Sequence, residues 1–260
     1  MTERKCTFSV RDGIAVMTVD NPPVNALAAA VLDDINNAVN EALIDDSVRV
    51  IILTGAGKRA FIAGADINEF VNLSEKKAGS DFLIKGQEIT NLIESADKPF
   101  IAAIHGFCLG GGMEFALACH IRLADETAQF GQPEINLGII PGYGGTQRGV
   151  RQMGKARALE LLLSGNFISA QQAADYGIVN RVVPAGEVLD EAMALAETIA
   201  KKSRMPVRAT IKAVNEGLGM EIGNALKLER EIWGELCETE DKEEGVAAFL
   251  EKRDAAFKDK

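Results

Sequence analysis

The sequence predicts an α/β fold, and two alternating patterns carry this prediction. Short apolar runs end at glycine turns: Val48 to Leu53 is followed by Gly55, and Phe100 to Ile104 is followed by Gly106. Stretches with apolar residues at helical spacing, such as residues 28–44, alternate with these runs. A recurring unit of strand, glycine turn and helix is typical of α/β folds.

The N-terminal part of the chain predicts a β-hairpin followed by a helix. Thr7 to Val10 and Ile14 to Val19 are β-branched runs separated by Asp12-Gly13, which is a typical hairpin turn. Pro22-Pro23 then interrupts regular structure before the helix of residues 28–44. Ala28 is a weak residue for capping this helix, because it has no side-chain acceptor.

The middle of the chain predicts further strands and helices, with one ambiguous segment. A helix is expected from about Gly111, and a strand near Ile121 to Ala124. Asn68 to Gly86 contains many charges and Gly79, which fits either a solvated, partly helical surface segment or a loop that covers a substrate. From about residue 185 the pattern becomes helical, with expected helices over residues 188–199, 206–218, 221–237 and 241–256.

Composition excludes several classes of function. The chain has 260 residues, 47% of them hydrophobic, and a formal net charge of −10, which opposes a general nucleic-acid or anionic-membrane partner. We see neither a signal-peptide core nor an apolar run of about 20 residues, so a cytoplasmic protein is expected. Four scattered cysteines and two histidines do not indicate a metal site, and Cys108 is expected to be a small buried residue.

Two glutamates set among glycines indicate the chemistry. Glu114 ends the run 109–114, which contains three consecutive glycines, and Glu134 follows Gly131-Gln132-Pro133. Two carboxylates near one reacting centre are typical of proton transfer, and the free amides at the start of a helix can bind a negatively charged oxygen. For either glutamate alone a surface position is the ordinary interpretation, since the chain has 38 acidic residues.

Two further glycine clusters flank this pair. Residues 61–67 follow a predicted strand, but they match neither a Walker loop nor a dinucleotide fingerprint. Residues 137–148 open another predicted helix, and Arg148 within them is expected to be a structural ion-pair partner.

The chain resembles the crotonase (enoyl-CoA hydratase/isomerase) superfamily over nearly its whole length, and its bacterial short-chain members most closely. The matching segments are residues 21–27, 60–67, 109–114, 130–134, 141–148 and 248–253. The resemblance implies a spiral of ββα turns over residues 1–195, with CoA and the active site, and a helical region over residues 196–260 for trimerisation and CoA covering. It also implies a homotrimer, or a homohexamer made from two trimers.

The resemblance implies reversible syn hydration of short-chain trans-2-enoyl-CoA to (3S)-3-hydroxyacyl-CoA, without a separate cofactor. Glu114 would activate water, Glu134 would transfer the α-proton, and the N–H groups of Ala63 and Gly111 would form the oxyanion hole. The residues expected to bind the acyl-CoA are Val24, Ala63, Gly64, Ala65, Asp66, Gly142, Phe249 and Lys252. Lys252 also fits a solvated helix face.

Alternatives remain at this point. An enoyl-CoA isomerase or another acyl-CoA lyase would use the same fold, but isomerases often keep only the carboxylate that matches Glu134. An RNA-binding member of the superfamily would need a basic surface, which the net charge of −10 opposes. His120 stands where the family commonly has aspartate, so its pairing with Arg122 is expected to differ.

Overall fold

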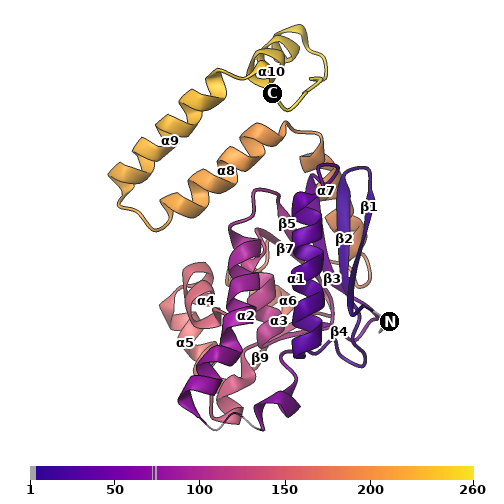
Figure 1. The fold of residues 1–260 in the computed structure, drawn as a ribbon, viewed down its shortest axis with the longest axis vertical. Coiled ribbons are helices and arrows are strands. Elements are labelled where there is room, and N and C mark those ends of the chain that lie inside the picture. Colours follow the sequence, from indigo (N-terminus) through magenta and orange to yellow (C-terminus); the bar gives the residue numbers. More distant parts are fainter. Residues whose placement is uncertain (1–3, 72, 74) are drawn as a thin grey trace.

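The computed structural model describes residues 4–71, 73 and 75–260 and has two β-sheets flanked by helices (Figure 1). The larger sheet has the strand order β1-β2-β3-β5-β7-β10, in which β1 and β2 form an antiparallel hairpin and the remaining pairs are parallel. Its strands are β1 (Cys6–Arg11), β2 (Ile14–Val19), β3 (Val50–Gly55), β5 (Phe100–Ile104), β7 (Ile121–Asp125) and β10 (Arg181–Val183). The α/β prediction and the predicted hairpin are confirmed.

The smaller sheet has the order β4-β6-β8-β9 and consists of three-residue strands. Its members are β4 (Ala60–Ile62), β6 (Phe107–Leu109), β8 (Gln129–Gly131) and β9 (Phe167–Ser169). Because β4 and β6 each follow a strand of the larger sheet after a short turn, the chain steps repeatedly from one sheet to the other. The ends of these short strands carry the segments with Ala63, Gly111 and Glu134.

Helices cover both faces of the larger sheet, and each face has its own apolar cluster. On one face α1 (Ala29–Ile44), α2 (Lys76–Glu94) and α3 (Gly111–Ala118) pack over side chains such as Ile51 and Leu53. On the other face α7 (Val188–Ala200) packs over Ile52 and its neighbours. Successive residues of a strand point to opposite faces, so a continuous apolar run is required by a sheet covered on both sides.

Shorter helices connect the strands around the smaller sheet. The 3-10 helices are η1 (Ile67–Phe70) and η2 (Pro133–Leu137), and the α-helices are α4 (Gly145–Met153), α5 (Lys155–Ser164) and α6 (Ala170–Asp175). The segment Asn68 to Gly86 is therefore largely helical, in η1 and the first half of α2. Its residues 72 and 74 lie outside the described part of the chain.

The C-terminal helices extend away from the sheets, as Figure 1 shows in orange and yellow. They are α8 (Arg204–Gly217), α9 (Ile222–Cys237) and α10 (Glu240–Glu251). The prediction of a helix over 241–256 is wrong at its end, because Lys252 adopts a left-handed φ of 56° and terminates α10. Helix α7 spans residue 195 and packs on the larger sheet, so the departure from the core follows Ala200.

Candidate active site

A cavity of about 780 Å³ brings together the segments that the sequence analysis singled out. Glu114 and Glu134 both line it. Five of the predicted oxyanion and CoA residues do so as well, and these are Ala63, Gly64, Ala65, Gly111 and Gly142. The structure therefore places two carboxyl groups and two glycine-rich turns around one space.

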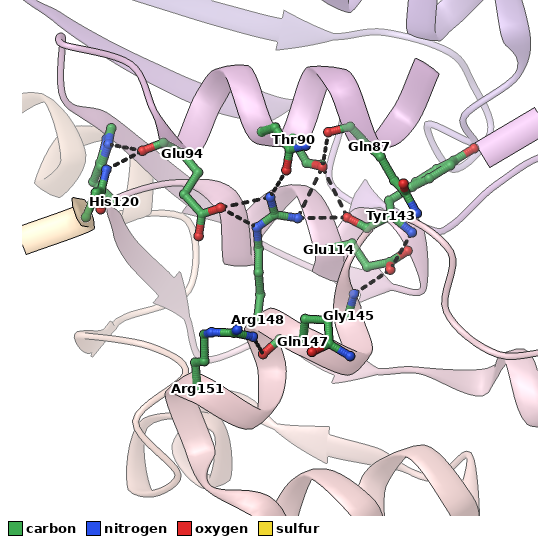
Figure 2. A network of polar contacts seen from close by, with 12 residues as sticks. Gln87, Thr90, Glu94, Glu114, His120, Tyr143, Gly145, Gln147, Arg148 and Arg151 are labelled. Carbon is green, nitrogen blue, oxygen red and sulfur yellow. Dashed lines mark hydrogen bonds and ion pairs between the residues drawn. The ribbon is translucent and has the colours of Figure 1, made fainter. Parts of the chain in front are cut away.

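Glu114 lies in α3, a helix whose eight residues are all buried. Only 1% of Glu114 is exposed, yet its Oε1 accepts hydrogen bonds of 2.7 Å from the N–H groups of both Tyr143 and Gly145 (Figure 2). Burial raises the pKa of Glu114 to about 7, although these two N–H groups and the positive charge of Arg148 act in the opposite direction. The group can therefore accept or release a proton near neutral pH.

Glu134 lies in the 3-10 helix η2 at the end of β8 and is half-buried. Burial, with a contribution from the negative charge of Glu114, raises its pKa to about 7. When the Gln132 amide is oriented with its nitrogen toward Glu134, that nitrogen donates to the two carboxylate oxygens at 3.0 and 3.1 Å. The two glutamates thus face the same cavity from different elements, and burial raises the pKa of both.

The three consecutive glycines before Glu114 have separable roles. Gly110 has a φ of 50°, and a Cβ there would lie 2.9 Å from Oε1 of Glu134. A Cβ on Gly112 would lie 2.0 Å from the carbonyl oxygen of Ile62, so this glycine permits close packing of α3 on β4. Gly111 is the first residue of α3, and the N–H of a first helical residue has no acceptor within its own helix.

The structure revises one predicted oxyanion-hole donor. The N–H of Ala63 donates 3.1 Å to the carbonyl oxygen of Val24 and is therefore occupied. Leu27 forms a parallel β-bridge with Ala65. The N–H of Leu27 donates to the carbonyl of Gly64, and the carbonyl of Leu27 accepts from the N–H of Asp66. In such a pairing the intervening N–H, that of Ala65, points away from Leu27. Among the described residues, that N–H makes no backbone hydrogen bond.

The remaining predicted CoA residues lie at different distances from the cavity. Val24 and Asp66 do not line the cavity. The carbonyl of Val24 accepts from the N–H of Ala63, and the Asp66 side chain caps η1 by accepting from the N–H of Asn68 at 3.0 Å. Phe249 is 83% exposed on α10, and Lys252 ends the same helix, far from α3 in Figure 1. A single chain therefore does not bring Phe249 and Lys252 to the glutamates.

Sequence reasoning did not single out the individual side chains that form the apolar side of the cavity. Phe82 and Leu83 of α2 contribute to it, and Phe70 packs edge-on against Phe82 with ring centroids 5.5 Å apart. Ile139 and Ile140, which follow η2, line the other side. The signal was available in the apolar residues among the charges of residues 68–86, and it supports the substrate-covering interpretation of that segment.

Three other expectations concern groups near the site. Arg148 is an ion-pair partner as predicted, because it bonds Glu94. His120 does not pair with Arg122; its Nδ1 accepts from the N–H of Phe100 at 2.9 Å, and its other ring nitrogen lies 3.1 Å from the carbonyl oxygen of Glu94. The start of α1, where Ala28 provides no cap, is capped instead by Glu69, whose Oε1 accepts from the N–H of Ala29 at 2.8 Å.

Comparison with known proteins decides the family. The family model described as enoyl-CoA hydratase/isomerase matches residues 9–260. The chain belongs to the enoyl-CoA hydratase/isomerase family. The predicted resemblance to the crotonase superfamily is thereby confirmed.

Individual relatives agree with this membership. The chain is 43% identical to a crotonyl-CoA hydratase of Syntrophomonas wolfei, over 94% of each protein, and 40% identical to a short-chain-enoyl-CoA hydratase of Clostridium acetobutylicum, over 92% of each. The crystal structure of an enoyl-CoA hydratase from Bacillus anthracis superposes with a TM-score of 0.94 at 35% identity, covering 98% of this chain and 100% of that one. The chain is therefore an enzyme of the lyase class, as the sequence predicted.

Proposed function

We propose that this enzyme catalyses the reversible syn hydration of short-chain trans-2-enoyl-CoA thioesters to (3S)-3-hydroxyacyl-CoA. The observation that carries the proposal is the pair Glu114 and Glu134, which face one cavity with pKa values raised to about 7. Similarity to a crotonyl-CoA hydratase and a short-chain-enoyl-CoA hydratase supports the substrate class.

In the hydration direction Glu114 acts as the base. Its carboxylate removes a proton from water, whose oxygen attacks Cβ, and the electrons of the double bond move toward the thioester oxygen. The N–H groups of Gly111 and Ala65 stabilise that oxygen as it gains negative charge, with Ala65 in place of Ala63. Glu134 then delivers its proton to Cα, and both roles reverse in dehydration.

The raised pKa values suit these assignments. A carboxyl group that titrates near the working pH can act as an acid or as a base, whereas one with an ordinary pKa is a poor proton donor at neutrality. One glutamate must be ionised and the other protonated at the start of each direction. Repulsion between Glu114 and Glu134 favours such singly protonated states.

CoA binding is proposed to be shared between subunits. Gly64, Ala65 and Gly142 line the cavity, whereas Phe249 and Lys252 lie on the distant α10. We assign these two residues to the CoA of a neighbouring subunit in a homotrimer or a hexamer of two trimers. Large exposed apolar side chains on the C-terminal helices, such as Leu218, Trp233 and Phe249, support an assembly through this region. We also propose a cytoplasmic location for the enzyme.

The experiment is a rate comparison with the purified enzyme. We expect crotonyl-CoA to lose its conjugated absorbance with formation of (3S)-3-hydroxybutyryl-CoA, and 3-hydroxybutyryl-CoA to give the reverse reaction. The rate should fall as the enoyl chain lengthens. Double-bond migration in 3-enoyl-CoA that greatly outpaces hydration would overturn the assignment in favour of an isomerase.

A further inference from the structure

The loop Gly142–Gly145 determines where the two N–H donors to Glu114 point. Since a peptide unit is planar and trans, its N–H and C=O point in opposite directions. The N–H of Tyr143 shares a peptide unit with the carbonyl of Gly142, which accepts 2.7 Å from Nε2 of Gln87. The N–H of Gly145 shares one with the carbonyl of Gly144, which accepts 2.8 Å from the N–H of Arg148. In both peptide units, a hydrogen bond to the carbonyl oxygen thus fixes the orientation of the N–H that donates to Glu114.

Between these two peptide units lies the one that joins Tyr143 to Gly144, and the side chain of Arg148 binds its carbonyl oxygen. Its Nη1 donates to the carbonyl of Tyr143 at 2.9 Å and to Oγ1 of Thr90 at 3.2 Å. Nε and Nη2 donate to Oε2 of Glu94 at 3.0 and 2.9 Å, and Nη2 also donates to Oδ1 of Asn91 at 2.6 Å. These contacts account for all five N–H donors of a guanidinium group. Arg148 is thus completely satisfied, and only 8% exposed.

The backbone of the loop is shaped around this guanidinium group. Gly144 has a φ of 111°, and a Cβ there would lie 2.2 Å from Nη1 of Arg148. Only glycine therefore leaves space for the group behind the loop. Figure 2 shows Arg148 between α2, which carries Thr90 and Glu94, and the Tyr143 backbone that bonds Glu114.

We propose that Arg148 is a positioning residue, which fastens the loop Gly142–Gly145 to α2 so that two backbone N–H groups stay directed at the carboxylate of Glu114. This inference rests on the proposed role of Glu114 as the water-activating base. Among the described residues, the guanidinium group bonds the loop at the carbonyl of Tyr143 and makes no hydrogen bond to Glu114 itself.

The charges around Glu114 give the expected direction of the effect. The groups that face it are Arg148 of α4, Glu134 of η2, the phenol of Tyr143 and, beyond Arg148, Glu94 of α2. Of these groups Arg148 carries a positive charge, and this charge lowers the pKa of Glu114. Removing Arg148 withdraws this charge and loosens the two N–H donors, and both changes favour the protonated carboxyl.

The test compares Arg148→Met, Arg148→Lys and Arg151→Met. Arg151 lies one turn further along the same helix, is exposed, and donates 3.0 Å to the carbonyl of Gln147, so its replacement removes the same charge without touching the loop. Lysine keeps the charge of Arg148 but not the planar arrangement of donors. Two quantities are measured: the pH profile of kcat/KM with crotonyl-CoA, and the infrared titration of the Glu114 carboxyl in the free enzyme, assigned by its loss in Glu114→Gln.

In Arg148→Met we expect kcat/KM to fall by about 10²-fold at neutral pH. We also expect the acid limb of the kcat/KM profile and the midpoint of the Glu114 carboxyl titration to move to higher pH by about one unit. Arg148→Lys should keep the titration midpoint closer to wild type and still lose rate, while Arg151→Met should match wild type in both. A lower melting temperature with unchanged titration and profile would overturn the proposal, because it would show a purely structural role.

If Arg148→Met does not fold, Thr90→Val provides the second variant. It removes a hydroxyl whose single proton can be donated to the carbonyl of Gln87 at 3.0 Å or to that of Tyr143 at 3.1 Å, and whose oxygen accepts from Arg148, without changing charge or size greatly. A smaller loss of kcat/KM is expected, and a wild-type rate would overturn the proposal. The infrared titration needs no substrate, so a shifted titration in an enzyme that does not hydrate crotonyl-CoA would refute the proposed function and leave the positioning role intact.

Discussion

The segments that carry Glu114 and Glu134 reach the same cavity by different physical means. Glu114 lies in a buried helix, and its carboxylate receives two N–H groups from a loop that Gln87, Thr90 and Arg148 hold in place. Glu134 lies in a 3-10 helix without buried residues, next to exposed apolar residues of the segment 137–140, with the Gln132 amide beside it.

Burial therefore raises the pKa of both glutamates, but different neighbouring groups modify the two shifts. Hydrogen bonds to the ionised form partly offset the cost of burial for both groups, but the charge of Arg148 lowers the pKa of Glu114, whereas the charge of Glu114 raises that of Glu134. A rigidly held base suits the activation of water, whose oxygen must be directed at Cβ. A less constrained acid suits proton delivery to Cα at the edge of the cavity.

The largest effect is expected when the two proposed roles are separated by partial reactions. Glu114→Gln and Glu134→Gln should each lower hydration of crotonyl-CoA by about 10³-fold, since each removes one acid–base group. With the saturated substrate butyryl-CoA, only α-proton exchange with solvent is possible. Glu114→Gln should retain this exchange and Glu134→Gln should lose it, which deuterium incorporation measured by NMR will show. Equal loss of exchange in both variants would contradict the division of roles.

A smaller effect should follow from disturbing Glu134 alone. A Cβ in Gly110→Ala would lie 2.9 Å from Oε1 of Glu134 and would displace the carboxylate, so kcat should fall by about 10-fold or more. Gly138→Ala is the control for a positive φ alone, because Gly138 has a left-handed φ of 74° and a Cβ there meets no atom within 4 Å among the described residues. It should lose roughly 1 kcal/mol of stability, measured by urea unfolding. Gly110→Ala should lose more, because Gly110 combines a φ of 50° with a ψ of −125°, which lies outside the left-handed helical region. A kcat that falls equally in both would point to backbone strain rather than to Glu134.

The sequence predicted the two glutamates because each lies in a distinctive local motif. It could not predict which N–H of residues 63–65 is free, since the decision depends on pairing with Val24 and Leu27, almost 40 positions away in the chain. The partner of Arg148, Glu94, is separated from it by 54 positions in the same way. Contacts of this kind are set by the fold, and a single sequence carries no local signal for them.

The same reasoning explains the differences in secondary structure. Strands of three residues, such as β4 and β6, are too short to show the alternation by which strands are recognised. The first half of α2 was ambiguous because the helix buries only Gly86, Ile89, Thr90 and Ile93, all in its second half. The hairpin and the strand Phe100–Ile104 were predictable, since longer runs of buried residues leave a clear pattern.

The smallest effect expected is on stability, and it has the opposite sign to the effect on activity. A carboxyl group can have a higher pKa in the folded than in the unfolded state. Its contribution to the free energy of unfolding is then fully present below the unfolded-state pKa and is lost as pH rises through the folded-state pKa. For Glu114 the loss occurs between about pH 4.5 and about pH 7, and a rise of this size corresponds to roughly 3 kcal/mol. Glu114→Gln should therefore unfold at higher urea than wild type at pH 8.

The gain in the free energy of unfolding should be about 1–2 kcal/mol. It is smaller than the full effect of the pKa shift, because a neutral amide oxygen accepts more weakly than a carboxylate from the N–H groups of Tyr143 and Gly145. It should disappear by about pH 4.5, where the wild-type carboxyl is protonated. Glu134→Gln should gain less, since Glu134 is only half-buried, and Glu88→Gln, at an exposed position of α2, serves as the control for charge alone. A loss of stability at pH 8 in Glu114→Gln would mean that the two N–H groups outweigh the cost of burying the charge, and the base would then be held ionised by the loop rather than tuned by burial.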